Sequence, residues 1–132
     1  MKERYFTIDN IDEKACQMAK DVAAFNRDRR MMFLSQRSAL LIIDMQDYFL
    51  NESSHAFVPS SPAIIHKILS LRKAFDLKKR PIIFTRHLNT SADAGMMASW
   101  WDELIERENP LSKISALFDT DDKYCRQKKY HQ

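Results

Sequence analysis

The chain has 132 residues, a formal net charge of +3 and a single glycine, Gly95, where average usage would give about nine. One glycine cannot form a GxGxxG dinucleotide motif, a GxxxxGK[ST] phosphate loop or a GxSxG nucleophile elbow, and it disfavours hairpin-rich β folds. The small basic excess is spread along the chain, so we expect no nucleic-acid partner.

The first predicted element is an amphipathic helix over residues 12–28. Its apolar positions recur at helical spacing between charged residues: Ala15, Ala19, Val22 and Phe25. Because this apolar face is thin, we expect the helix to lie against a larger surface such as a neighbouring subunit, and the protein to be a homo-oligomer. We therefore interpret residues 1–36 as a helical extension of a domain that spans residues 37–132.

Residues 39–43, Ala-Leu-Leu-Ile-Ile, form a continuous apolar run that predicts a strand buried on both faces, as in parallel sheets. After a loop at 51–61, Ser61 and Pro62 are expected to cap and begin a helix. The apolar stripe of that helix is Ile64, Ile68, Leu71 and Phe75. A second strand is predicted over residues 81–85. Strand, helix and strand form a βαβ unit with parallel strands, which indicates the α/β class.

Residues 86–99 are expected to be irregular, followed by a short helix over 100–108 that ends before an Asn-Pro breaker. The neighbouring Trp100 and Trp101 either wall a cleft or form the buried face of that helix, and we favour the buried face. A third strand is expected to start at Tyr124 and Cys125.

The two cysteines, Cys16 and Cys125, form no CxxC motif, so we expect neither a structural zinc site nor a disulfide framework. Both are expected to be ordinary thiols. The N-terminus lacks the apolar stretch of a signal peptide, and no apolar run is long enough to span a membrane. We therefore expect a cytoplasmic protein.

The residues that follow the two predicted strands are the candidates for chemistry, because ligands of open α/β sheets bind beyond the carboxyl ends of the strands. Asp44 follows the first strand, and Arg86 and His87 follow the second. A partly desolvated carboxylate at a strand end is a good proton acceptor, although Asp44 can also simply cap the next turn. His87 is either a pocket residue or a solvent-facing loop residue.

Residues 39–49, Ala-Leu-Leu-Ile-Ile-Asp-Met-Gln-Asp-Tyr-Phe, resemble the first strand and first catalytic segment of the isochorismatase-like cysteine hydrolases. Residues 81–86, Pro-Ile-Ile-Phe-Thr-Arg, resemble the second strand of that family, and the likeness spans roughly residues 37–130. It implies a Rossmann-like three-layer α/β/α fold with a parallel sheet, incomplete at its C-terminus in this chain. It also implies hydrolysis of a small amide, carbamoyl or enol-ether substrate.

The family's triad is aspartate, lysine and cysteine, in which the aspartate takes the thiol proton and the cysteine forms a covalent adduct. The resemblance implies Asp44 as the proton carrier and Lys128 as the lysine, with Lys129 as the alternative. No residue of this chain matches the nucleophile, because Cys125 precedes the candidate lysine. The substrate-binding residues implied are Gln46, Phe49, Arg86, His87 and Trp100.

Two branches of the family help to place this chain. Nicotinamidase-like members hold a metal with an Asp-x-His motif where this chain has His87, Leu88 and Asn89, so we expect no metal and no cofactor. Siderophore-type isochorismatases dispense with the cysteine and use the aspartate as an acid on a vinyl ether, but the segment after the second strand is closer to the thiol-dependent branch. The alternative to a hydrolase is a catalytically incomplete member that binds or assembles through unpaired sheet edges.

Overall fold

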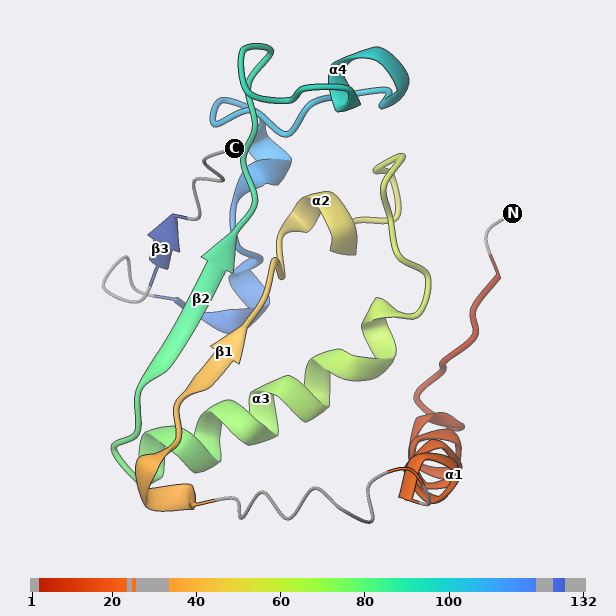
Figure 1. Cartoon of the computed structure of the whole chain (residues 1–132), viewed down its shortest axis with the longest axis vertical. Helices are drawn as coiled ribbons and strands as arrows, with labels where there is room; N and C mark the ends of the chain where they lie inside the picture. The colour runs from red at the N-terminus through yellow and green to blue at the C-terminus, as the bar shows by residue number, and fades with distance from the viewer. Residues whose placement is uncertain (1–2, 24, 26–33, 121–124, 128–132) are drawn as a thin grey trace. The chain divides into compact units, whose positions relative to one another are not determined.

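The computed structural model describes residues 3–23, 25, 34–120 and 125–127, and these residues include a three-stranded sheet of order β1-β2-β3 (Figure 1). The strands are β1 (Leu40–Ile42), β2 (Ile82–Arg86) and β3 (Cys125–Gln127), and both neighbouring pairs are parallel. The predicted α/β class and parallel sheet are confirmed, with strand bounds within one residue of those expected for β1 and β2.

The register of the sheet brings the carboxyl ends of all three strands to one edge. Ile42 pairs with Phe84, and Phe84 pairs with Cys125. Ile42 and Phe84 are buried, but Leu41 and Ile43 are 52% and 54% exposed, so burial of the run 39–43 on both faces was a wrong prediction. Side chains alternate between the two faces of a strand, so Leu41 and Ile43 lie on the face opposite to that of Ile42. β1 is also an edge strand of the described sheet.

The chain divides into two compact units. One unit comprises Met1–Ala39 and Pro59–Pro81 and contains α1 (Ile11–Ala23), η2 (Ser35–Arg37) and α3 (Ser61–Leu77). The other comprises Leu40–Val58 and Ile82–Gln132 and contains the sheet with four short helical segments: α2 (Asp47–Leu50), α4 (Met97–Trp100), η3 (Pro110–Ser112) and η4 (Ala116–Phe118). No helix in the described part of the chain is long and apolar enough to cross a bilayer.

The N-terminus of α3 lies one residue earlier than expected. Its N-cap is Ser60, not Ser61, and Pro62 stands in the first turn. The Ser60 hydroxyl does not cap the helix, because its Oγ accepts a hydrogen bond of 3.0 Å from the backbone N–H of Phe6. A contact with a distant segment of the chain has therefore displaced the local cap.

The C-terminus of α3 closes on a left-handed residue. Lys79 has φ 51°, and the Arg80 N–H donates to the Phe75 carbonyl oxygen at 2.9 Å, five residues back. This hydrogen bond is typical of a Schellman ending, in which glycine usually occupies the left-handed position.

Replacing Lys79 with glycine is expected to raise the free energy of unfolding by about 1 kcal/mol, because glycine has no Cβ to clash at positive φ. Urea unfolding of Lys79→Gly measures this. Lys78→Gly is the control, since Lys78 has φ −90° and gains nothing from glycine. A Lys79→Gly protein less stable than the wild type would contradict the expectation.

The helix predicted over residues 100–108 is wrong. The structure has α4 at Met97–Trp100, and turns and irregular chain follow it. The backbone N–H of Ile105 donates to Asn89 Oδ1 at 2.8 Å, so tertiary contacts take the hydrogen bonds that a helix would use. Gly95 lies just before α4 with φ 53°, a conformation that glycine adopts without steric cost. The predicted helix 12–28 ends as α1 at Ala23, and residues 24 and 26–28 lie outside the described residues.

Candidate active site

The turn after β1 presents Asp44 at the carboxyl edge of the sheet. Asp44 has φ 53°, and the Gln46 N–H donates to the Asp44 carbonyl oxygen at 2.8 Å across the turn. A left-handed conformation costs a non-glycine residue about 1–2 kcal/mol, and aspartate is among the residues that tolerate it best. Such conformations cluster at functional sites, where the surrounding structure holds them in place.

Thr85 of β2 holds the Asp44 carboxylate. Its hydroxyl donates to Asp44 Oδ1 at 2.7 Å, while the Asp44 N–H approaches Thr85 Oγ1 at 3.2 Å and the Thr85 carbonyl oxygen at 3.3 Å. Thr85 is buried, and Asp44 is half-buried. Among the described residues no group bonds to Asp44 Oδ2, so one carboxylate oxygen is positioned and the other remains for a proton or a ligand.

Gln46 ties this turn to the rest of its unit. It is fully buried, and its Nε2 donates to the carbonyl oxygens of Ser112 at 2.6 Å and His87 at 3.0 Å. Its Oε1 accepts from the His87 N–H at 2.7 Å. Both amide hydrogens are thus committed to the backbone, which makes Gln46 a positioning residue here, and its predicted contact with substrate stays a prediction.

The other predicted binding residues differ in how deeply they are buried. Arg86, the last residue of β2, and His87 are half-buried, and Phe49 of α2 packs against a cluster of buried aromatic and aliphatic side chains. Trp100 is 61% exposed and contacts Trp101 edge to face, with ring centroids 5.3 Å apart. The predicted burial is therefore wrong for Trp100, whereas Trp101 packs against the cluster.

The structure does not test the predicted lysine. Lys128 and its alternative Lys129 lie outside the described residues. Gln127, the last residue of β3, pairs in register with Arg86, so β3 ends at the same edge of the sheet as β2.

Sequence reasoning missed a buried polar group around Tyr48 of α2. The Tyr48 hydroxyl donates to the Glu103 carbonyl oxygen at 2.5 Å and accepts from Trp101 Nε1 at 2.8 Å. His55 Nε2 lies 2.7 Å from the same oxygen, and His55 Nδ1 lies 3.8 Å from the Asp102 carboxylate. His55 lies in the loop predicted over residues 51–61, which was assigned no role. The available signal was a tyrosine on a buried helix, whose hydroxyl must find partners inside the protein.

Burial raises the pKa of Tyr48 above its ordinary value of 10.0; the hydrogen bond from Trp101 opposes this, and the Glu103 and Asp102 charges add to it. A raised folded-state pKa of an acid means that the fold favours the neutral phenol. Its contribution to stability is complete below pH 10 and is lost as the pH rises through the folded-state pKa.

We expect the urea concentration at the unfolding midpoint of the wild type to decrease as the pH is raised from about 9 to about 11. The decrease should be smaller for Tyr48→Phe, which has no phenol to ionise at position 48. Tyr5→Phe, at an exposed position, serves as the control and should keep the wild-type slope. Equal slopes for wild type and Tyr48→Phe would contradict the assignment.

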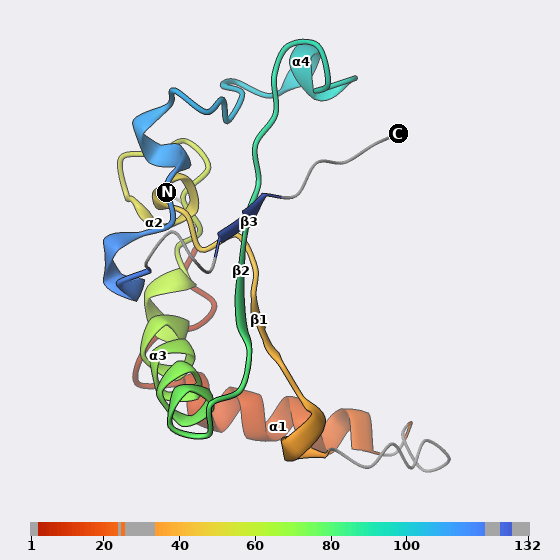
Figure 2. The same cartoon turned by 90° about the vertical axis from the view of Figure 1, so that its left-hand side faces the viewer.

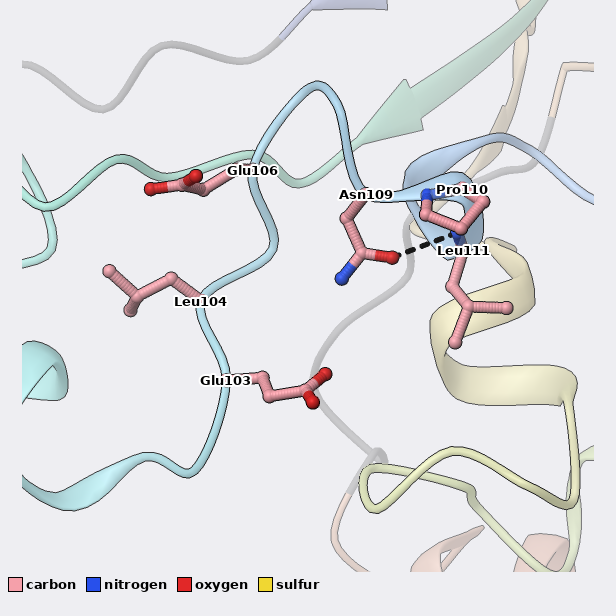
Figure 3. Close-up of a pocket in the computed structure, with 6 residues that line it drawn as sticks. All are labelled: Glu103, Leu104, Glu106, Asn109, Pro110 and Leu111. Atoms are coloured by element: carbon pink, nitrogen blue, oxygen red, sulfur yellow. Dashed lines mark hydrogen bonds between the residues drawn. The ribbon is translucent and has the colours of Figure 1, made fainter.

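A separate shallow hollow opens on the segment before η3 (Figure 3). It is lined by Glu103, Leu104, Glu106, Asn109, Pro110 and Leu111. Asn109 Oδ1 accepts from the Leu111 N–H at 2.9 Å, which fixes one wall. None of the predicted site residues lines this hollow, so we base the candidate site on the Asp44 turn. Within the described part of the chain, no three or more His, Cys, Asp or Glu side chains gather to hold a metal ion.

No protein-family model matches the chain, and no curated protein matches it. Among solved structures, its fold is similar to that of a cysteine hydrolase from Pseudomonas syringae pv. phaseolicola 1448A, with a TM-score of 0.64 and 21% sequence identity. The match covers 75% of this chain and 49% of the hydrolase chain, so this chain spans about half the length of that structure. The likeness shows that the parallel sheet and its connections follow a cysteine-hydrolase fold.

Proposed function

We propose that this chain is an isochorismatase-like hydrolase that acts on a small amide, carbamoyl or enol-ether substrate, with Asp44 as its proton carrier. The observation that carries the proposal is the Asp44 carboxylate, held by the buried Thr85 hydroxyl at the carboxyl edge of a parallel sheet. This is the edge at which ligands of such sheets bind. The fold shared with a cysteine hydrolase supports the same reaction class.

Asp44 acts as the proton carrier in either of two routes. On an amide or carbamoyl group, it takes the proton of a thiol, the thiolate attacks the carbonyl carbon, the amine leaves with a proton, and water then hydrolyses the thioester. This route needs a cysteine that the sequence resemblance does not match to any residue here. On an enol ether, protonated Asp44 gives its proton to the terminal carbon. Water then adds to the resulting cation and returns a proton to Asp44, and the neutral adduct breaks down to a carbonyl compound and the alcohol.

The remaining residues are proposed to surround that carboxylate. Lys128 supports the charged intermediates, while Arg86, His87 and Phe49 contact a small-molecule substrate, with Trp100 at its outer side. Arg86 is the last residue of β2 and His87 comes directly after it, so both lie at the carboxyl edge of the sheet, where Asp44 also lies. This position supports their role in the proposal. We propose that the reaction uses no metal or other cofactor and takes place in the cytoplasm.

A substrate panel tests the proposal and separates its two routes. The purified protein and its Cys16→Ser/Cys125→Ser form are assayed with small amides, carbamoyl compounds and enol ethers. Enol-ether hydrolysis that survives loss of both thiols would support the acid route. Amide hydrolysis that is lost with the thiols would support a hydrolase but overturn the prediction that both cysteines are ordinary thiols. A folded protein that turns over none of the panel would contradict the hydrolase proposal for this chain.

A second candidate is an assembly module without catalysis. It is favoured by β1, an edge strand of the described sheet. Leu41 on this strand and Ile43 just after it are half exposed, although strands of parallel sheets are normally covered on both faces. An open edge can pair with a strand of another polypeptide. Ile43→Lys should then abolish association without unfolding the protein, whereas a monodisperse monomer with a cooperative thermal transition would count against this function.

A further inference from the structure

Helix α1 carries an apolar stripe that its own unit leaves open. The stripe repeats at spacings of four, three and four residues, the pattern of a coiled-coil seam: Ile11, Ala15, Met18 and Val22. Its first residue, Ile11, is buried, but Met18 and Val22 are 50% and 51% exposed. The stripe therefore starts inside the fold and continues onto the open surface.

An ion pair ties the first turn of α1 to α3. Lys67 of α3 bonds the Asp12 carboxylate at 2.5 Å, and this contact lowers the pKa of Asp12. Figure 2 shows α1 beginning beside α3 and then extending away from it. A 13-residue helix is marginal in water unless its apolar face is packed, so the outer turns of α1 require a partner.

We propose that this stripe, formed by Ala15, Met18 and Val22, packs antiparallel against the same stripe of a second copy of the chain. A seam with a 4-3 repeat is self-complementary, because its side chains fit between those of an identical helix. In the antiparallel arrangement Met18 of one copy lies against Ala15 of the other, and a two-fold axis relates the pair.

Charge selects the antiparallel direction. Lys14 and Asp21 lie seven residues apart on the same edge of the stripe, so antiparallel pairing sets Lys14 of each copy beside Asp21 of the other, twice in the dimer. In a parallel pair, the side of the stripe that carries Lys14 and Asp21 would face the other side of the partner's stripe. That other side carries Asp12, which is already bonded to Lys67, and the uncharged Ala19.

The neighbouring groups leave these two side chains able to pair. Lys14 Nζ donates to the Tyr5 carbonyl oxygen at 2.6 Å and lies 3.9 Å from the Tyr5 ring centroid, which uses one of its three donors. Asp21 accepts from Gln17 Nε2 at 2.7 Å and retains further acceptor positions. The seam from Ala15 to Val22 is about 10 Å long, so the interface is small and the dimer is weak and concentration-dependent.

Sedimentation equilibrium of the full chain over the micromolar range tests the dimer, with a reductant present because Cys16 is exposed. We expect a reversible dimer in the wild type and at least tenfold weaker association in Met18→Glu. Lys20→Glu, on the other side of α1, is the control and should associate like the wild type. A wild type that stays monomeric, or a dimer that Met18→Glu leaves intact, would overturn the proposal.

A charge swap tests the direction and guards against a variant that fails to fold. Lys14→Glu should weaken the dimer by placing like charges together, and Lys14→Glu/Asp21→Lys should restore it. Far-UV circular dichroism checks that α1 remains helical in each protein. Failure of the double variant to recover association would overturn the antiparallel assignment, and neither result depends on hydrolase activity.

Discussion

Gln46→Ala is expected to lower the free energy of unfolding by about 3–5 kcal/mol, a large part of the roughly 5–15 kcal/mol that stabilises a typical domain. The substitution leaves three backbone groups without the partner that the buried side chain provides: the half-buried N–H and carbonyl of His87 and the buried carbonyl of Ser112. Each unsatisfied buried group costs about 1–3 kcal/mol, and a water that enters the space recovers only part of this. Urea unfolding measures the loss.

Two further variants separate hydrogen bonding from side-chain volume. Gln46→Glu keeps the size and the acceptor for the His87 N–H, but it places an oxygen against two carbonyl oxygens, so it should also be strongly destabilised. Gln17→Ala, exposed on α1, should change stability by less than about 0.5 kcal/mol. A Gln46→Ala protein within about 1 kcal/mol of the wild type, with a changed KM, would show that Gln46 acts on substrate instead.

Asp44→Asn is expected to lower kcat/KM about 1,000-fold on any substrate that the protein hydrolyses, within the usual range for a residue that transfers a proton. Asparagine tolerates the left-handed conformation of this turn, and its Oδ1 still accepts the Thr85 hydroxyl proton. The loss should therefore appear in the rate and not in the fold. Steady-state kinetics and urea unfolding of the same preparations measure both.

Asp47→Asn is the matched control, because Asp47 lies in the same segment but begins α2, and its N–H bonds the Lys113 carbonyl oxygen at 3.1 Å. It should retain activity within about tenfold of the wild type, since a carboxylate in the first turn of a helix stabilises that helix by only about 0.3–1 kcal/mol. Equal losses in the two variants would assign the effect to the segment as a whole and contradict a specific role for Asp44.

The sequence was sufficient for the sheet and for the position of Asp44. Continuous apolar runs predicted β1 and β2 to within one residue. Such runs are typical of parallel sheets, whose strands are usually buried. The acidic residue after the first run then had to lie at the carboxyl edge. The bond from Thr85 was not predictable, since it depends on the register that places β2 beside β1.

Contacts between distant residues explain what the sequence did not reveal. Residues 100–108 do not form the predicted helix, because the Ile105 N–H donates to Asn89 and the Trp101 ring N–H donates to the Tyr48 hydroxyl. The Ser60 hydroxyl accepts a hydrogen bond from the Phe6 N–H instead of capping α3. Local propensity was correct about neither, because one tertiary hydrogen bond or one buried aromatic contributes as much as several residues of helix preference.

The most direct measurement of the central claim, that Asp44 transfers the proton in a hydrolytic reaction, is product analysis in heavy-oxygen water. Mass spectrometry immediately after quenching should find one heavy oxygen in each product molecule formed by the wild type, and labelled product forming about 1,000-fold more slowly with Asp44→Asn. Product formed without the label, or labelled product formed equally fast by Asp44→Asn, would contradict it.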